Sequence, residues 1–131
     1  MANEAVNIEL PKIIVRRTVA DGAAIALNTL MTLTDPNTVV ATSGDAQPFG
    51  GIAIEEKTAN DGVTEIGCAL DVVWDIKATT ATIGVGKMVN VGGTNLVNLA
   101  VDGDFEAGTL VGRTEEEVAN DEVVRVRLMG F

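Results

Sequence analysis

The 131-residue sequence predicts an all-β fold, a small β-barrel, β-tulip-like domain or sandwich with little helix. The sequence contains short apolar segments, rich in valine and isoleucine, at close spacing. Typical turn residues separate them, and the chain contains fourteen glycines, a residue common in turns. In the last segment, Val124, Val126 and Leu128 alternate with charged or exposed positions. Such alternation is typical of a half-buried strand.

The predicted strands begin at residue 30. Residues 30–34 lead into Asp35-Pro36-Asn37, where proline suits the second position of a tight turn. The predicted strands are residues 30–34, 39–41, 50–56, 63–68, 71–77, 83–91, 96–101 and 123–128. Two segments allow at most one helical turn each: residues 23–27, which are alanine-rich, and residues 114–117, which fit a capping box.

The first twenty residues differ from the rest. Pro11 interrupts their apolar run, and proline, which lacks an amide N–H, is confined to strand edges or breaks. We therefore expect residues 1–20 to form an extended N-terminal arm or else an ordinary first strand, and residues 21–131 to form a single β-rich body. Residues 49–56 and 110–116 share an apolar–glycine–acidic rhythm, a likeness too weak to define a repeat.

Composition narrows the classes of function. The chain has no histidine and no tyrosine, so it lacks the commonest general base and has few aromatic rings for stacking. Its formal net charge of −10 disfavours nucleic acid and anionic membranes as partners. We find neither a signal peptide nor an apolar run long enough to span a membrane. The single cysteine, Cys68, cannot form an internal disulfide, and we expect it to be a small buried apolar residue.

Three polar motifs are candidates for chemistry, and each has a simpler interpretation. Asp102-Gly103-Asp104 with Glu106 suggests calcium but lacks the EF-hand spacing, so we interpret it as a turn. Asp71 and Asp75 would share a strand face, as in a glycosidase pair, yet we interpret them as surface charge. Lys87 is similar to the modified lysine of biotinyl and lipoyl carrier domains, but its flanking residues lack that pattern. We therefore predict no catalytic residue, no cofactor and no metal site.

The order of the segments resembles that of small bacteriophage capsid decoration proteins, also called cement or head-stabilising proteins. The segments that carry this resemblance are residues 28–36, Phe49-Gly50-Gly51-Ile52-Ala53, residues 69–76, Val89-Asn90-Val91-Gly92-Gly93 and residues 123–128. The resemblance covers roughly residues 20–128. It implies a barrel-like or tulip-like body that gathers as homotrimers on the outside of an icosahedral head, bridges major capsid subunits and resists the pressure of packaged DNA.

We accordingly expect a structural protein of the virion, made in the host cytoplasm and bound to the outer capsid surface. Its expected partners are the phage major capsid protein and further copies of itself, without nucleic acid or membrane. An extended arm can add main-chain hydrogen bonds to an exposed sheet edge. The residues predicted to bind the capsid are Ile8, Leu10, Lys12, Ile13, Ile14, Val15, Arg16 and Arg17. The alternatives are a β-barrel module of a phage tail or fibre, and an enzyme or carrier domain.

Overall fold

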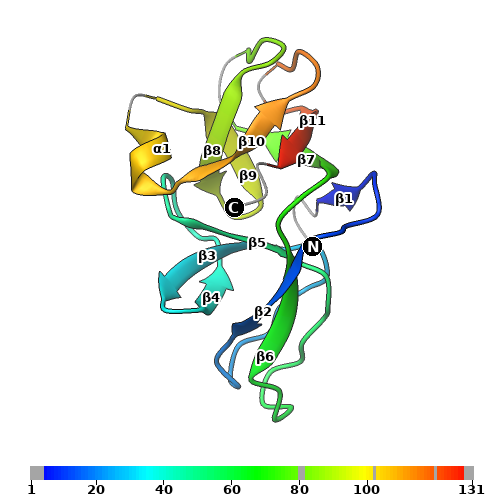
Figure 1. Ribbon diagram of the computed structural model, residues 1–131, viewed down its shortest axis with the longest axis vertical. Helices are drawn as coiled ribbons and strands as arrows, with labels where there is room; N and C mark the ends of the chain where they lie inside the picture. Colours follow the sequence, from blue (N-terminus) through cyan, green and yellow to red (C-terminus); the bar gives the residue numbers. More distant parts are fainter. Residues whose placement is uncertain (1–4, 80–81, 102, 120, 129–131) are drawn as a thin grey trace.

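The computed structural model describes residues 5–79, 82–101, 103–119 and 121–128, and these residues are almost wholly in strands and turns (Figure 1). The one helix in this described part is the short α1 (Asp104–Ala107). The predicted all-β barrel fold with little helix is therefore confirmed. No helix among the described residues has the length and apolar character needed to cross a membrane.

The first barrel forms the lower half of the molecule in Figure 1. Its strands are β2 (Ile14–Thr18), β3 (Leu30–Asp35), β4 (Thr38–Ala41), β5 (Phe49–Ala53) and β6 (Glu65–Ala69). They close in the order β2-β4-β3-β5-β6, in which only the β2–β4 pair is parallel. Residues 14–18, predicted as arm or first strand, are thus a strand of this barrel.

The second barrel forms the upper half of Figure 1. Its strands are β7 (Val73–Ala78), β8 (Met88–Gly93), β9 (Leu96–Leu99), β10 (Leu110–Thr114) and β11 (Val123–Leu128). The sheet runs β7-β11-β10-β8-β9, and a parallel pairing of β7 with β9 joins its two ends. A further short strand, β1 (Val6–Asn7), pairs with the edge of β7.

The two barrels repeat one topology, with the same register. Each barrel has one parallel pair, β2–β4 or β7–β9, and the same four antiparallel pairs. In the first barrel Met31 lies opposite Gly51, and in the second barrel Val89 lies opposite Gly112 at the equivalent position. A β-bulge adjoins each of these two pairs. Both two-residue hairpin turns end on an asparagine in the left-handed region, Asn37 and Asn95. The fold therefore contains a tandem repeat that the sequence did not define. The two segments with a weak sequence likeness, residues 49–56 and 110–116, contain the equivalent strands β5 and β10.

Other sequence expectations differ from the structure locally. Strand β10 was not among the predicted strands, because Gly112 and Arg113 interrupt its apolar pattern. Neither residues 23–27 nor residues 114–117 form a helical turn, and Thr114 ends β10 instead. Strand β8 starts later than predicted, and Ile83 forms only an isolated bridge to Val118.

The barrels pack as one body through a shared core. The first barrel has a small core of its own around Met31, Ile66 and Cys68. Leu30 and Ile52 instead pack in the larger core of the second barrel, which contains the fully buried Trp74. The buried hairpin residue Asn95 extends this contact, since its Oδ1 accepts the Leu30 N–H at 2.8 Å and its own N–H donates to Thr42 Oγ1 at 3.1 Å.

We predict that Gly112→Ala destabilises the fold by about 3 kcal/mol, because its Cβ would collide with the main-chain carbonyl of Arg127, which cannot move without disrupting β11. The control is Gly84→Ala, whose Cβ would have no neighbour nearer than 3.8 Å. Chemical denaturation followed by circular dichroism measures both variants. Equal stability of the two would show that the β10–β11 contact is looser than the structure describes.

Candidate interaction surface

The N-terminal segment runs along the outside of both barrels. The Ile8 and Glu9 amides donate to the Val73 carbonyl, which attaches the segment to the second barrel beside β1. Further along, the Asp71 carboxylate accepts the Lys12 and Ile13 amides at 3.1–3.2 Å. The N-terminal segment is therefore bound to its own chain up to β2, and residues 14–18 are a strand of the first barrel.

Five apolar side chains of this segment face solvent. We call them the N-terminal patch: Val6, Ile8, Leu10, Ile13 and Ile14. Leu10 is 83% exposed, and the other four are between 40% and 55% exposed. Single exposed apolar residues are ordinary, whereas a run of them on one segment is typical of an interaction site. Four of the five were among the predicted arm residues, and Val6 was missed although it continues the same apolar run.

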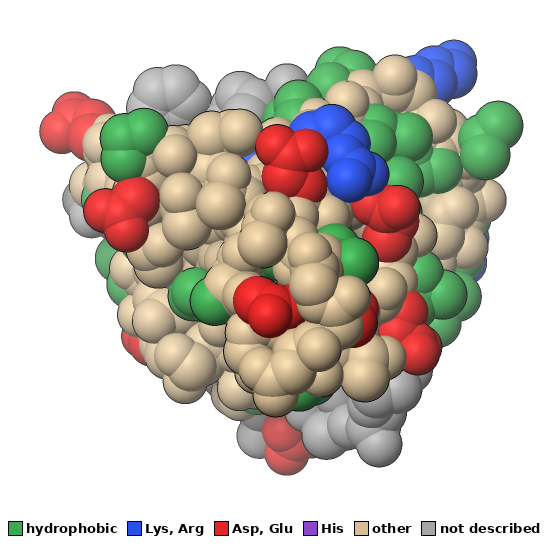
Figure 2. Space-filling view, turned by 90° about the horizontal axis from the view of Figure 1, so that it is seen from below, with side chains coloured by type: hydrophobic (Ala, Val, Ile, Leu, Met, Phe, Trp, Pro, Cys, Tyr) green, Lys and Arg blue, Asp and Glu red, His purple; other side chains and the backbone are tan. Residues whose placement is uncertain are grey.

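The basic residues beside the patch are mostly engaged within the first barrel. Arg16 forms an ion pair with Glu55, whose carboxylate also accepts the Gly67 amide. Arg17 donates to Asn37 Oδ1 at 3.2 Å across the junction of β2 and β4. Of these three basic residues, only Lys12 has a side chain with neither an ion pair nor a hydrogen bond among the described residues. Figure 2, which views the molecule from below Figure 1, shows acidic side chains scattered over this end and few basic ones.

Ion pairs also cover the outer face of the second barrel. Arg125 pairs with Asp75 at 3.1 Å, and this contact raises the pKa of the guanidinium. Arg127 pairs with Glu115 at 2.8 Å and with Glu9 of the N-terminal segment at 3.4 Å, and both raise its pKa. Because these pairs are solvent-exposed, each contributes little to stability. One of them, Arg127–Glu9, links the N-terminal segment to β11.

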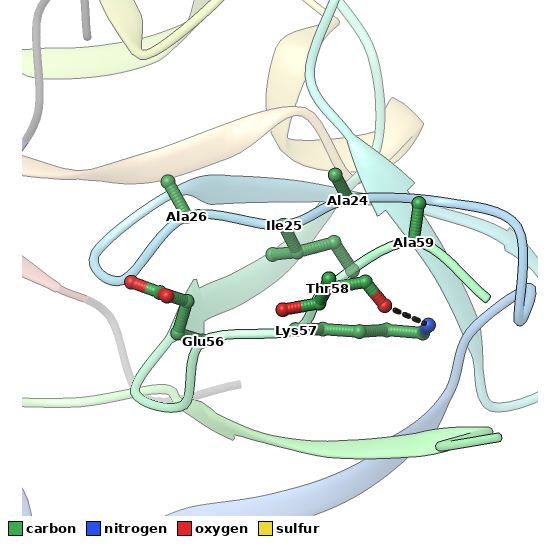
Figure 3. A pocket seen from close by; sticks show the side chains of 7 residues that line it. All are labelled: Ala24, Ile25, Ala26, Glu56, Lys57, Thr58 and Ala59. Atoms are coloured by element: carbon green, nitrogen blue, oxygen red, sulfur yellow. Dashed lines mark hydrogen bonds between the residues drawn. The ribbon is translucent and has the colours of Figure 1, made fainter. Parts of the chain in front are cut away.

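The larger of the two best-defined hollows on the described surface, about 530 Å³, lies beside the bridge between Ile25 and Lys57 (Figure 3). Its lining is mostly apolar and includes three alanines. The Lys57 side chain is fully buried, and its ammonium donates to the Asp21 carbonyl, the Thr58 carbonyl and Asp61 Oδ1 at 2.6–3.1 Å. All three protons are thereby used, so Lys57 is structural and does not offer a reactive amine to the hollow.

The acidic residues considered as candidates in the sequence have separate structural partners. Asp71 holds the N-terminal segment while Asp75 pairs with Arg125, so the two carboxylates do not act together. Asp104 and Glu106 were predicted to lie in a turn but belong to the short helix α1, and Asp102 lies outside the described residues. Asp104 is buried, and its carboxylate accepts hydrogen bonds from Val101, Asn90 and Thr109. Within the described ranges, no three acidic, cysteine or histidine side chains are grouped closely enough to hold a metal ion.

Comparison with known proteins adds one finding about the fold. No family model matches the chain, and no curated protein matches its sequence. Among solved structures, the chain is similar to the head fiber gp8.5 N base of bacteriophage phi29, with a TM-score of 0.54 and 13% identity. The match covers 88% of this chain and 92% of that chain. The chain thus shares an overall fold with a structural component of a phage head.

We predict that the Lys57–Asp61 contact makes stability depend on acid pH. Lys57 is the largest cause that lowers the pKa of Asp61 below its ordinary value of 3.8, so the folded state binds this proton less readily than the unfolded state. The resulting stability is present above pH 3.8 and is lost as the pH falls through the folded pKa. Asp61→Asn should therefore show a shallower acid decline in urea titrations, whereas Asp35→Asn, at the exposed last residue of β3, is the control and should follow the unaltered protein. Parallel declines in all three proteins would contradict this assignment.

We predict that the Cys68 thiol is unreactive in the folded protein. Cys68 is fully buried, and desolvation raises its pKa to about 11, so the reactive thiolate is scarce near neutral pH. Titration with Ellman's reagent should detect the thiol only after denaturation. Stoichiometric labelling of the native protein within minutes would show that the first barrel opens readily.

Proposed function

We propose that the protein is a non-enzymatic structural protein of a phage virion that binds the outer surface of the assembled head. The observation that carries this proposal is the likeness in fold, over most of both chains, to the head fiber base of phi29. The sequence resemblance to capsid decoration proteins favours the same location. The partner is the major capsid protein, and the bound form is a homotrimer that bridges neighbouring capsid subunits.

The surface chemistry supports adhesion. Burying one fully exposed large apolar side chain contributes about 1.5–3 kcal/mol, so covering the N-terminal patch, with Leu10 at 83% exposure, would favour attachment. A protein that binds the assembled shell and not its separated subunits stabilises assembly by mass action. The net charge of −10 opposes non-specific association between free copies. Attachment therefore depends on a complementary surface such as a shell.

A second candidate is the base of a head fibre, favoured by the name of the similar structure. The two functions differ in stoichiometry, since a cement protein occupies many equivalent positions on each shell. Quantitative cosedimentation with assembled heads, together with light scattering of the free protein, distinguishes them. Saturation at a few copies per head would favour the fibre base.

We predict that Leu10→Asp lowers binding to assembled heads at least tenfold, because a charge replaces the most exposed apolar side chain of the patch. Val85→Asp is the matched control, since Val85 is 65% exposed but belongs to a turn of the second barrel. Both substitutions should leave the circular dichroism spectrum unchanged. Undiminished cosedimentation of the Leu10 variant would exclude the patch as the attachment surface.

A further inference from the structure

The two barrels differ at one strand edge. Main-chain groups of odd-numbered residues in and beside β2 form the hydrogen bonds to β6 and its neighbours. For example, the Leu70 amide donates to the Ile13 carbonyl, and the Val19 amide donates to the Thr64 carbonyl. The even-numbered residues of an antiparallel strand then direct their main-chain groups to the opposite edge. There Thr18 donates to the Asn37 carbonyl, at the junction with β4. Ile14 and Arg16 have no strand or turn partner on that edge among the described residues.

The equivalent edge in the second barrel is occupied. When the two barrels are aligned, β2 corresponds to β7 and β6 corresponds to β11. Arg16 lies opposite Gly67 in the first pair, and Asp75 lies opposite Arg125 in the second. Arg16 and Asp75 therefore occupy equivalent positions. In the second barrel β1 pairs antiparallel with this edge, with Val6 opposite Asp75. Within the described residues, one copy of this strand position is therefore filled and the other is vacant, and Figure 1 shows β1 beside β7 with no labelled strand in the same place beside β2.

Burial of the neighbouring side chains follows this difference. Trp74 and Ile76 of β7 are fully buried, and Ala5, just before β1, packs in the same core. The corresponding residues of β2, Val15 and Arg17, are only partly buried. The first barrel thus has an incompletely covered side at the vacant edge.

From this we infer that the vacant edge of β2 is a docking site for an extended, acidic segment of the shell protein, which adds to the first barrel as an antiparallel strand. Strand addition of this kind takes its affinity from main-chain hydrogen bonds and its specificity from alternate side chains. The inference rests on the proposed function only for the identity of the partner. The strand site itself rests on the comparison of the two barrels.

The charges at the edge define the chemistry of the added segment. Lys12 has no ion pair, and the buried Nε of Arg17 has no hydrogen-bond partner in the described part of the chain. Because Lys12 and Arg17 are five positions apart in an extended segment, two acidic side chains of the incoming strand, one near each residue, would satisfy them. Basic residues often protect an exposed edge from pairing, but the side chains of Arg16 and Arg17 are bound to Glu55 and Asn37 instead. The half-exposed Ile14 offers contact to an apolar residue of the incoming strand.

A second copy of this chain fits the edge poorly. Its own β1 is already paired with its second barrel. An antiparallel pair of β2 edges centred on Ile14 would place Lys12 of one copy opposite Arg16 of the other, and directly opposed like charges are destabilising. The net charge of −10 on each copy also opposes their association. The occupant is therefore a segment of a different protein.

The site can be tested first with a peptide. The probe is Ala-Val-Asn-Ile-Glu-Leu, the sequence of residues 5–10, which includes the strand that fills the equivalent edge and carries one acidic residue. Added at millimolar concentration to the ¹⁵N-labelled protein, it should slow hydrogen exchange of the Ile14 and Arg16 amides by about threefold to tenfold at saturation. A control peptide methylated on the valine and isoleucine nitrogens, which in β1 point toward β7, should have no effect.

The same two amides are then followed in protein bound to assembled heads. Two variants separate main-chain pairing from side-chain adhesion: Ile14→Pro removes the edge N–H at the first residue of β2, where proline is tolerated, and Ile14→Ala keeps it. We expect Ile14→Pro to abolish protection by the peptide and by heads, and Ile14→Ala to weaken binding only in part. Circular dichroism and unchanged exchange at Val15 and Arg17, which face β6, check that the first barrel remains closed.

The outcomes separate the edge site from the proposed function. Head binding without protection of Ile14 and Arg16 by peptide or heads would overturn the edge site and leave the proposed function intact. Protection by the peptide without head binding would support the edge site and contradict the proposed function. Equal loss of binding in Ile14→Pro and Ile14→Ala would also overturn the inference, because it would assign the effect to the side chain.

Discussion

The three residues between the barrels, Leu70 to Val72, join both barrels and the N-terminal segment. The Asp71 carboxylate binds the N-terminal segment, while its carbonyl accepts the indole N–H of Trp74 at 3.1 Å. The Val72 carbonyl accepts the amide of Leu128 at the end of β11. Val72 itself has a φ of 66°, a conformation that is costly for a β-branched residue and persists only where its surroundings determine it. The relative placement of both barrels and the N-terminal segment thus depends on this short junction.

The repeat shows that backbone geometry can be kept while side chains change. Gly51 and Gly112 occupy equivalent positions, and at both a Cβ would clash with the neighbouring strand. Ile52, by contrast, is buried against the second barrel, whereas the equivalent Arg113 is exposed. One barrel uses this surface for internal packing and the other presents it to solvent. The two copies of a common framework have therefore taken different roles within one chain.

The sequence predicted the features that local patterns determine. The alternation in residues 123–128 matches the bounds of β11, and Asp35-Pro36-Asn37 marks the turn between β3 and β4. Strand β10 was missed because Gly112 is there for a close approach to β11 and Arg113 points outward, so neither adds to an apolar pattern. The closure of two separate barrels depends on pairings between distant segments, which short strands leave weakly specified in sequence.

The candidate surface was partly predictable for a related reason. Its apolar residues are visible in the sequence, but their attachment to the rest of the chain is set by Asp71 and Val73, which are distant in sequence and carry no recognisable signal. The engagement of Arg16 and Arg17 within the first barrel likewise depends on partners from other strands. The role of these residues in capsid binding stays a prediction.

The shared core imposes an order on folding during synthesis. The first barrel has all its strands once residue 69 has left the ribosome, yet Leu30, Ile52 and Ala69 lack the core against which they pack until β7 to β11 have been made. In that interval an apolar surface of a finished barrel remains uncovered, and such surfaces make partly folded chains prone to aggregation. The speed with which the second half of the chain follows the first therefore contributes to the yield of native protein.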